Sequence, residues 1–191
     1  MSNSRSLSER DREVVWHPFT AVRQDTLNIG LKGGEGVYLI AENGDRYLDA
    51  IGSWWVNLHG HAHPDISKAV ADQASQLEHA IFAGFTHEGA VELAERLLKH
   101  MPNAHSHIFY SDNGSTAIEV AIKLAIQYWY NQGEKRKRII AIDGSYHGDT
   151  FGAMSVGERG VFTEPFDPYL FGVDFIDFPE AGMEDKVFDQ F

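Results

Sequence analysis

The chain has 191 residues, of which 16 are Lys or Arg and 28 are Asp or Glu, so its formal net charge is −12 at pH 7. A surface this acidic repels phosphate backbones and argues against a nucleic-acid-binding protein. The absence of cysteine excludes disulfides, zinc–thiolate sites and cysteine nucleophiles. No apolar run is long enough to cross a membrane. The polar residues 1–12 hold no signal-peptide core, so we expect a cytoplasmic protein with no membrane partner.

The first part of the chain predicts an aromatic arm followed by a β-hairpin. Residues 16–19 (Trp-His-Pro-Phe) place two large rings beside a proline, as in an arm that packs on a core or closes over a site. Farther along, two apolar runs at 37–40 and 46–51 flank the pair Asn43-Gly44. An Asn-Gly pair between apolar runs indicates a tight hairpin turn in which both residues adopt positive φ.

Two amphipathic helices are expected next. The first covers about 64–79, where Pro64 suits the first turn because no backbone donor is needed there. The second covers about 87–100, with Thr86 as a candidate N-cap. Apolar residues recur every three or four positions in both segments, so each helix has one face suited to packing.

The second half of the chain alternates strand and helix. Apolar runs of strand type occupy 107–111, 138–142 and 173–176, and a helix is expected over 116–131. This helix has only a narrow polar stripe and should therefore be mostly buried. A strand–helix–strand unit of this length forms a right-handed crossover in a parallel sheet, so the fold class is α/β. Residues 183–190 look like the start of a further helix.

The strongest chemical signal is Asp-Asn-Gly-Ser-Thr at 112–116, between an expected strand and the buried helix. The N-terminus of a helix presents unpaired N–H groups and a partial positive charge, so it can bind a phosphate. Gly114 would let the backbone approach the anion, and the Ser115 hydroxyl would add a donor. The alternative is an ordinary capped helix start. No Gly-Lys-Ser/Thr sequence is present, so this is not the phosphate loop of nucleotide hydrolases.

A second polar segment, Gly-Ser-Tyr-His-Gly-Asp-Thr at 144–150, follows the next expected parallel strand. The carboxyl ends of parallel strands form the edge at which open α/β sheets bind ligands. The ring of Tyr146 could stack there on a flat cofactor, and Asp149 supplies a carboxylate nearby. The alternative is a polar turn in which Tyr146 packs into the core.

Two further clusters carry weaker signals. Trp54 and Trp55 are adjacent, and neighbouring side chains on an extended segment point to opposite sides, so one ring could face a pocket while the other joins the core. The alternative places both rings in the core. His59, His61 and His63 alternate along the chain. Ligand-spaced carboxylates and a His-Glu-x-x-His helix are missing, so we expect no metal site.

Taken together, these segments resemble the class III, fold type I aminotransferases, which use pyridoxal 5'-phosphate. The Gly-Ser helix start and the Tyr-His-Gly turn are typical of the class. The Trp-His-Pro arm, the double tryptophan and the Gln-Tyr-Trp helix end point to its biotin-pathway branch. The resemblance extends from about Trp16 to Val156 and is carried by the segments 16–20, 52–55, 59–60, 63–64, 114–115, 127–129 and 146–156.

The resemblance implies a fold and a cofactor site. The chain would form the N-terminal segment and the first part of the large parallel-sheet domain of a fold type I transferase. An arm and hairpin of the small domain would occupy 1–60, and an incomplete cofactor-binding domain would occupy 61–191. Gly114 and Ser115 would hold the phosphate of the cofactor, and Tyr146 would lie against its pyridine ring.

The resemblance also implies a reaction. Members of the biotin-pathway branch convert 8-amino-7-oxononanoate to 7,8-diaminononanoate with S-adenosylmethionine as amino donor, and fold type I enzymes are homodimers. Trp54 and Tyr146 would line the substrate pocket, and Asp149 would help to orient substrate. Phe19 stands where the family usually has tyrosine, so stacking on adenine is retained but a hydroxyl hydrogen bond is lost.

The decisive gap is lysine. Transamination needs a lysine that forms a Schiff base with the cofactor and moves the proton. In the family this residue follows later in the sequence, which here means beyond Phe191, and no lysine of this chain is placed like it. We therefore expect a fragment that lacks its own catalytic residue. The alternatives are another class III aminotransferase acting on ornithine, 4-aminobutyrate or another ω-amino acid, and a non-catalytic module that keeps the fold.

Overall fold

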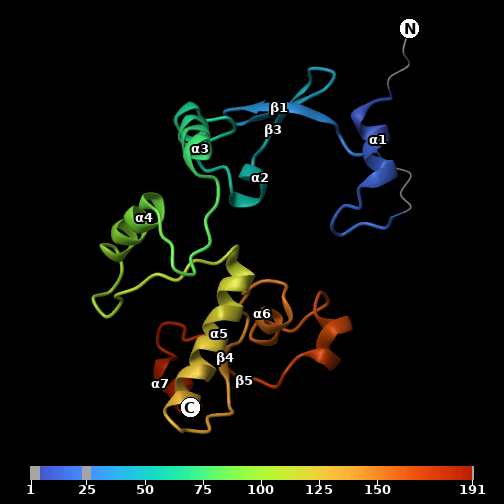
Figure 1. Cartoon of the computed structure of the whole chain (residues 1–191). Helices are drawn as coiled ribbons and strands as arrows, with labels where there is room; N and C mark the ends of the chain where they lie inside the picture. The colour runs from blue at the N-terminus through green and yellow to red at the C-terminus, as the bar shows by residue number, and fades with distance from the viewer. Residues whose placement is uncertain (1–4, 23–26, 191) are drawn as a thin grey trace. The chain divides into compact units, whose positions relative to one another are not determined.

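The computed structural model describes residues 5–22 and 27–190 (Figure 1). The chain divides into two compact units, one that ends at Glu88 and one that begins at Gly89. Each unit has a sheet of its own, antiparallel in the first and parallel in the second. Within the described ranges, no helix is both long and apolar enough to cross a membrane.

The first unit begins with α1 (Leu7–Val14), a helix that the hydrophobic pattern did not predict. Its start is a capping box. The Ser6 hydroxyl accepts from the N–H of Glu9 at 3.2 Å, and the Glu9 carboxylate accepts from the N–H of Ser6 at 2.8 Å. This reciprocal pair satisfies two donors that a helix start otherwise leaves free. The aromatic arm follows, and its Trp16 indole donates to the carbonyl of Thr20 at 2.9 Å.

The predicted hairpin is confirmed and extended by one strand. The sheet has the order β1 (Leu31–Glu35), β2 (Tyr38–Ala41), β3 (Arg46–Leu48), and both strand pairs are antiparallel. In the β2–β3 turn only Gly44 has positive φ (+95°), so the expectation that Asn43 shares it is wrong. The N–H of Gly44 bonds to the carbonyl of Ala41, and a three-residue loop with a glycine bulge results.

Both predicted amphipathic helices are present. α3 (Pro64–Gln76) has its proline in the first turn, as expected, and ends three residues earlier than the pattern suggested. α4 (Glu88–Leu98) begins too late for Thr86 to be its N-cap, so that assignment is wrong. Arg96 and Glu92 form an ion pair one turn apart on α4, as its charge spacing favours.

The second unit keeps part of the predicted strand–helix alternation. Its elements are α5 (Gly114–Asn131), β4 (Ile140–Ile142), α6 (Phe151–Ser155), the 3₁₀ helix η1 (Glu164–Tyr169), β5 (Asp174–Ile176) and α7 (Glu184–Phe188). β4 and β5 pair in parallel, so that part of the prediction is confirmed. The strand expected at 107–111 is wrong. An apolar run becomes a strand only beside a partner strand, and no described segment pairs with this one.

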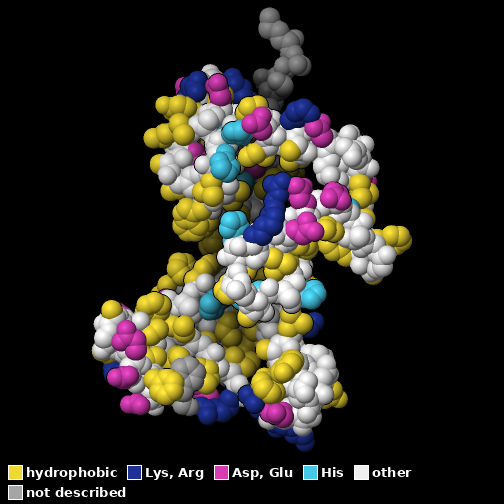
Figure 2. Space-filling view, turned by 90° about the vertical axis from the view of Figure 1, so that its left-hand side faces the viewer, with side chains coloured by type: hydrophobic (Ala, Val, Ile, Leu, Met, Phe, Trp, Pro, Cys, Tyr) yellow, Lys and Arg dark blue, Asp and Glu magenta, His cyan; other side chains and the backbone are white. Residues whose placement is uncertain are grey.

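Buried apolar side chains gather in the second unit. Five of them lie on or beside α6, β5 and α7, namely Ala153, Met154, Val156, Ile176 and Val187, whereas Ala41 is the buried apolar residue described in the first unit. The prediction that α5 is mostly buried is wrong, because none of its residues is buried and Leu124 and Ile126 are more than half exposed. Within the second unit α5 packs against α6, and one short helix cannot cover an 18-residue helix. Hydrophobic side chains are accordingly widespread on the face seen in Figure 2.

Candidate functional site

The start of α5 presents free backbone donors. The Asn113 side chain caps the helix by accepting from the N–H of Thr116 at 2.9 Å, and the Thr116 hydroxyl accepts from the N–H of Asn113 at 3.1 Å. Across the part of the chain that the structure describes, the N–H groups of Gly114 and Ser115 have no acceptor. The ordinary cap is therefore present, yet it leaves two donors at the positive end of an 18-residue helix.

The loop after β4 lies directly against the side chain of Ser115. The hydroxyl oxygen of Ser115 accepts a hydrogen bond from the N–H of Asp149 at 3.2 Å. Gly148 is buried with φ of +116°, and a Cβ atom at this position would lie 1.9 Å from the Ser115 hydroxyl oxygen. Only glycine allows an approach this close. Gly148 was not among the predicted site residues, because its role depends on a contact 33 positions away in the sequence.

Tyr146 and Asp149 interact within the same loop. The Tyr146 hydroxyl donates to a carboxylate oxygen of Asp149 at 3.0 Å. This hydrogen bond and the negative charge of Asp149 raise the pKa of the Tyr146 phenol above its ordinary value. Tyr146 is 76% exposed, which excludes the alternative that it packs into the core of this unit. The ring is therefore free to contact a flat ligand.

A second side chain of α5 fixes the far end of this loop. A carboxylate oxygen of Glu119 accepts from the N–H of Gly152 at 2.7 Å, at the beginning of α6. Ser115 and Glu119 are four residues apart and so share one face of α5. Together they hold the segment 149–152 by its backbone N–H groups. Glu119 also escaped prediction, since its position on the helix suggested an exposed polar stripe.

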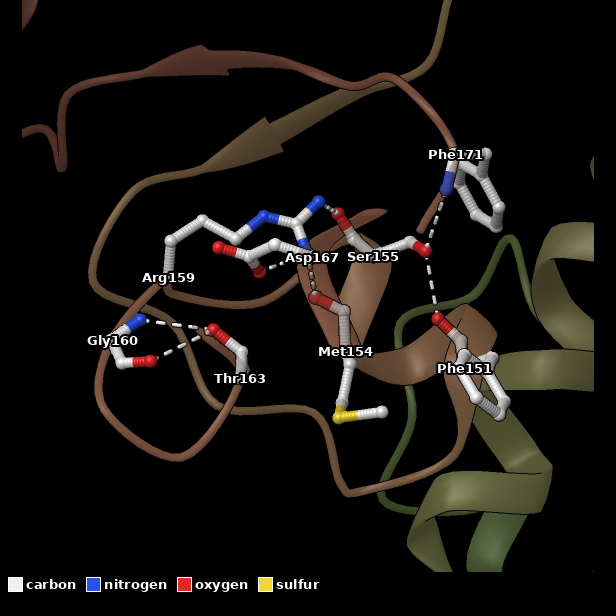
Figure 3. A network of polar contacts seen from close by, with 8 residues as sticks. All are labelled: Phe151, Met154, Ser155, Arg159, Gly160, Thr163, Asp167 and Phe171. Carbon is white, nitrogen blue, oxygen red and sulfur yellow. Dashed lines mark hydrogen bonds and ion pairs between the residues drawn. The ribbon is translucent and has the colours of Figure 1, made fainter. Parts of the chain in front are cut away.

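The other end of α6 is held by Arg159 (Figure 3). Its guanidinium donates to the carbonyls of Met154 at 3.2 Å and Ser155 at 3.0 Å, and lies 3.8 Å from a carboxylate oxygen of Asp167. The fully buried Ser155 donates to the carbonyl of Phe151 at 2.7 Å. The guanidinium thus adds donors to carbonyls at the C-terminal end of α6, and the Ser155 hydroxyl adds one within the helix.

The remaining predicted residues lie in the first unit. Trp54 and Trp55 are 66% and 71% exposed, with ring centroids 5.6 Å apart and planes tilted by 53°. Neither ring is in the core, and the expectation that they point to opposite sides is wrong because α2 (Gly52–Trp55) is a helical turn and not an extended segment. Phe19 is 88% exposed at the edge of a hollow of about 540 Å³ formed by residues 16–21.

The alternating histidines do not converge. The Nε2 atom of His61 lies 2.8 Å from a carboxylate oxygen of Asp49, whereas the rings of His59 and His63 contact each other edge to face with centroids 6.2 Å apart. Over the described stretches, no group of three or more metal-ligating side chains gathers.

The sequence and the fold match a known family. The model of the family "Aminotransferase class-III" matches residues 19–189. The chain belongs to the class III aminotransferases. The chain is 52% identical to the adenosylmethionine-8-amino-7-oxononanoate aminotransferase of Synechococcus elongatus, over 90% of the chain and 41% of that relative. The same enzyme of Geobacter sulfurreducens is 41% identical over 88% of the chain and 38% of its own length.

Solved structures of class III aminotransferases have the same fold. The adenosylmethionine-8-amino-7-oxononanoate aminotransferase of Methanocaldococcus jannaschii superposes with a TM-score of 0.84 at 38% identity, covering 92% of this chain and 41% of that one. The omega transaminase of Pseudomonas jessenii in complex with PMP superposes with a TM-score of 0.82 at 27% identity, covering 92% and 40%. The chain thus spans about two fifths of the length of the relatives it matches.

The residues at the start of α5 fit the cofactor of this family. Class III aminotransferases depend on pyridoxal 5'-phosphate. A phosphate needs several hydrogen-bond donors and a positive potential, and the free N–H groups of Gly114 and Ser115 provide both. The Ser115 hydroxyl accepts from Asp149, so its own proton can be donated to an anion.

Proposed function

We propose that the full-length protein transfers an amino group from S-adenosylmethionine to 8-amino-7-oxononanoate and forms 7,8-diaminononanoate in biotin biosynthesis. The observation that carries this proposal is the 52% identity, over 90% of the chain, to a relative named for these two substrates. Other transaminases, among them omega transaminases, share the fold at 26–28% identity, which supports the class but not the substrates. The proposal includes a cytoplasmic homodimer with the domain division at residue 60, as the family implies.

The start of α5 is the proposed phosphate seat. The N–H groups of Gly114 and Ser115 and the Ser115 hydroxyl would donate to the phosphate, and the helix dipole would favour its charge. The exposed ring of Tyr146 would lie against the pyridine ring. When bound, the cofactor supplies an electron sink that makes proton removal from the amino-bearing carbon possible. The lysine that moves this proton would come from a later part of the sequence than these 191 residues.

The proposed substrate contacts are Trp54, Phe19 and Asp149. Trp54 presents a flat apolar ring, which suits the long apolar chain of the oxononanoate. Phe19 would stack on the adenine of the amino donor without contributing a hydroxyl group. Asp149 holds the hydroxyl of Tyr146 at 3.0 Å and would thereby orient the ring that borders the substrate.

The test is a choice of amino donor. The full-length protein is supplied with 8-amino-7-oxononanoate and with S-adenosylmethionine, ornithine or 4-aminobutyrate as the sole donor, and 7,8-diaminononanoate is measured by mass spectrometry. We expect product with S-adenosylmethionine. Product with ornithine or 4-aminobutyrate instead would overturn S-adenosylmethionine as the donor, and no product with any donor would assign the chain to another class III activity.

A second test concerns Trp54. In the full-length enzyme, Trp54→Ala should raise the KM for 8-amino-7-oxononanoate by about tenfold, because the substrate chain loses a large apolar contact. The KM for S-adenosylmethionine should change much less. An unchanged KM for the oxononanoate would remove Trp54 from the substrate pocket.

A further inference from the structure

The two exposed tryptophans lie on a backbone turn with positive φ angles. The residues of α2 have φ of +55° at Gly52, +48° at Ser53, +69° at Trp54 and +67° at Trp55. The N–H of Trp55 bonds to the carbonyl of Ile51 at 2.8 Å, and that of Val56 bonds to the carbonyl of Gly52 at 2.9 Å. This is one turn of left-handed helix. Residues with a Cβ atom avoid this conformation, so the surrounding structure must hold it in place.

The largely buried carboxylate of Asp49 holds this turn in place. The side chain of Asp49 is only 6% exposed. One of its oxygens accepts from the Ser53 hydroxyl at 2.7 Å and lies 2.8 Å from Nε2 of His61. The backbone N–H and the hydroxyl of Ser53 hold the pKa of Asp49 below its usual range. Asp49 therefore connects the left-handed turn to His61.

Both ends of this connection are fixed to the antiparallel sheet. The N–H of Asp49 bonds to the carbonyl of Val37 at 2.9 Å. His61 exchanges two backbone hydrogen bonds with Gly36, at 2.7 and 3.1 Å, and its side chain is 13% exposed. A Cβ atom on Gly34 would lie 2.7 Å from that of His61, so the histidine packs directly against β1. The sheet thus provides the fixed frame from which Asp49 reaches Ser53.

We propose that Asp49 is a positioning residue for substrate selection, because its bonds to Ser53 and His61 fix the left-handed turn that presents Trp54 and Trp55 side by side. The role in selection rests on the proposed function, which places Trp54 at the substrate. The role in holding the turn does not. Ser53 is the link between the carboxylate and the indoles, since it directly precedes Trp54.

The experiment compares full-length variants by spectroscopy and kinetics. Two indoles this close and tilted couple their electronic transitions, which gives opposite-signed bands in the far-UV circular dichroism spectrum. The contribution of the pair is the difference between the wild type and Trp54→Phe. Asp49→Ala and Ser53→Ala should lose most of this difference signal, whereas Asp49→Asn should keep part of it because an amide oxygen still accepts from Ser53. Asp45→Ala, which removes an exposed carboxylate from the β2–β3 turn, is the matched control.

Kinetics test the role in selection. Asp49→Ala should raise the KM for 8-amino-7-oxononanoate by about tenfold, with kcat and the KM for S-adenosylmethionine changed by less than about threefold. Asp49→Asn should restore part of the loss. A general loss of structure would instead lower kcat and raise both KM values together.

The outcomes separate the two proposals. An unchanged dichroism signal in Asp49→Ala and Ser53→Ala would overturn the inference, whatever the activity. A lost signal with an unchanged KM would overturn the role in selection, because Trp54 would not contact the substrate. If Asp49→Ala does not fold, Ser53→Ala decides, since it removes a single hydroxyl. If the wild type does not use these substrates at all, the proposed function fails and the dichroism signal still judges the role of Asp49 in the turn.

Discussion

The Ser115 hydroxyl group can make two hydrogen bonds at once, one as an acceptor and one as a donor. Its oxygen accepts from the N–H of Asp149 at 3.2 Å and so ties the loop after β4 to the start of α5. Its proton remains available for the phosphate that the helix start would bind. The same side chain therefore connects the proposed phosphate seat with the loop that carries Tyr146.

Removing this hydroxyl should weaken cofactor binding. In the full-length protein, Ser115→Ala should lower the affinity for pyridoxal 5'-phosphate by at least about tenfold, because a hydrogen bond to a charged group contributes about 1.5–3 kcal/mol. The affinity is measured by titrating the apoprotein and following cofactor absorbance. Ser106→Ala removes an exposed serine of the same unit and is the control. Equal affinities for Ser115→Ala and the control would place the phosphate elsewhere.

The acidity of Tyr146 gives a test of its contact with Asp149. The carboxylate accepts the phenol proton and its charge opposes the phenolate, so the pKa of Tyr146 is raised and the ring stays protonated to higher pH. Asp149→Asn should bring the pKa down toward its ordinary value. The tyrosine titration is followed by NMR on ring-labelled protein, with Tyr146→Phe to assign the signal. A pKa that Asp149→Asn leaves in place would contradict the contact.

At the scale of elements, the sequence predicts what depends on local pattern. The helices α3, α4 and α5 follow from apolar spacing, and so does the place of residues 114–115 at a helix start, where the phosphate seat is proposed. The strand at 107–111 was wrong because pairing depends on a partner that the pattern does not contain. The left-handed α2 was missed because periodicity assumes right-handed helices or extended strands.

Long-range contacts set the same limit for the site. Gly148 and Glu119 reach across the sequence to residues that no local pattern connects with them. The role of Asp49 could not be predicted for a similar reason. Its carboxylate binds a left-handed turn, and residue types alone do not show whether a turn is left-handed. Ser6 and Glu9, by contrast, form a capping pair of standard spacing that could have revealed α1.

The crossing of the loop over α5 leads to a prediction about Gly148. Gly148→Ala would place a methyl group 1.9 Å from the Ser115 hydroxyl oxygen and would also strain a residue with φ of +116°. We expect a loss of stability of about 2–4 kcal/mol, from overpacking and positive φ together, and weaker cofactor binding. Both are measured on the full-length protein by denaturant unfolding and cofactor titration.

Gly133 offers the matched control for this substitution. It also has positive φ (+76°), but a Cβ atom there would meet nothing within 4 Å. Gly133→Ala should therefore cost only about 1–2 kcal/mol, the backbone part of the effect, and leave cofactor affinity unchanged. If both variants lose the same stability and affinity, the close approach of the loop to Ser115 is not important.

At the scale of the whole chain, apolar surface exceeds what the described residues cover. In the first unit α3 exposes Ile66 and Val70, and in the second α5 exposes Leu124 and Ile126. Each of these side chains lies on a helix whose spacing is that of a packed face. Exposed apolar faces of this kind are what an interface with further protein would cover.

Isolated residues 1–191 should behave accordingly. A polypeptide of this length expressed alone should bind the dye ANS strongly and unfold without a sharp transition, because few apolar side chains are buried within either unit. The full-length protein, measured under the same conditions, should unfold cooperatively and bind little dye. A sharp transition of the short polypeptide without dye binding would show that its exposed faces need no cover.

The two hydrogen bonds from the loop after β4 to side chains of α5 constrain the length of that loop. Ser115 and Glu119 are separated by about one helical turn, roughly 6 Å along the axis, and they fasten Asp149 and Gly152, three residues apart on the loop. These two spacings match, so an insertion or deletion between 149 and 152 would break one of the two hydrogen bonds. Surface loops ordinarily tolerate such length changes. This one should have a fixed length wherever Ser115 and Glu119 are both kept, and a homologue with a longer loop should have lost one of the two side chains.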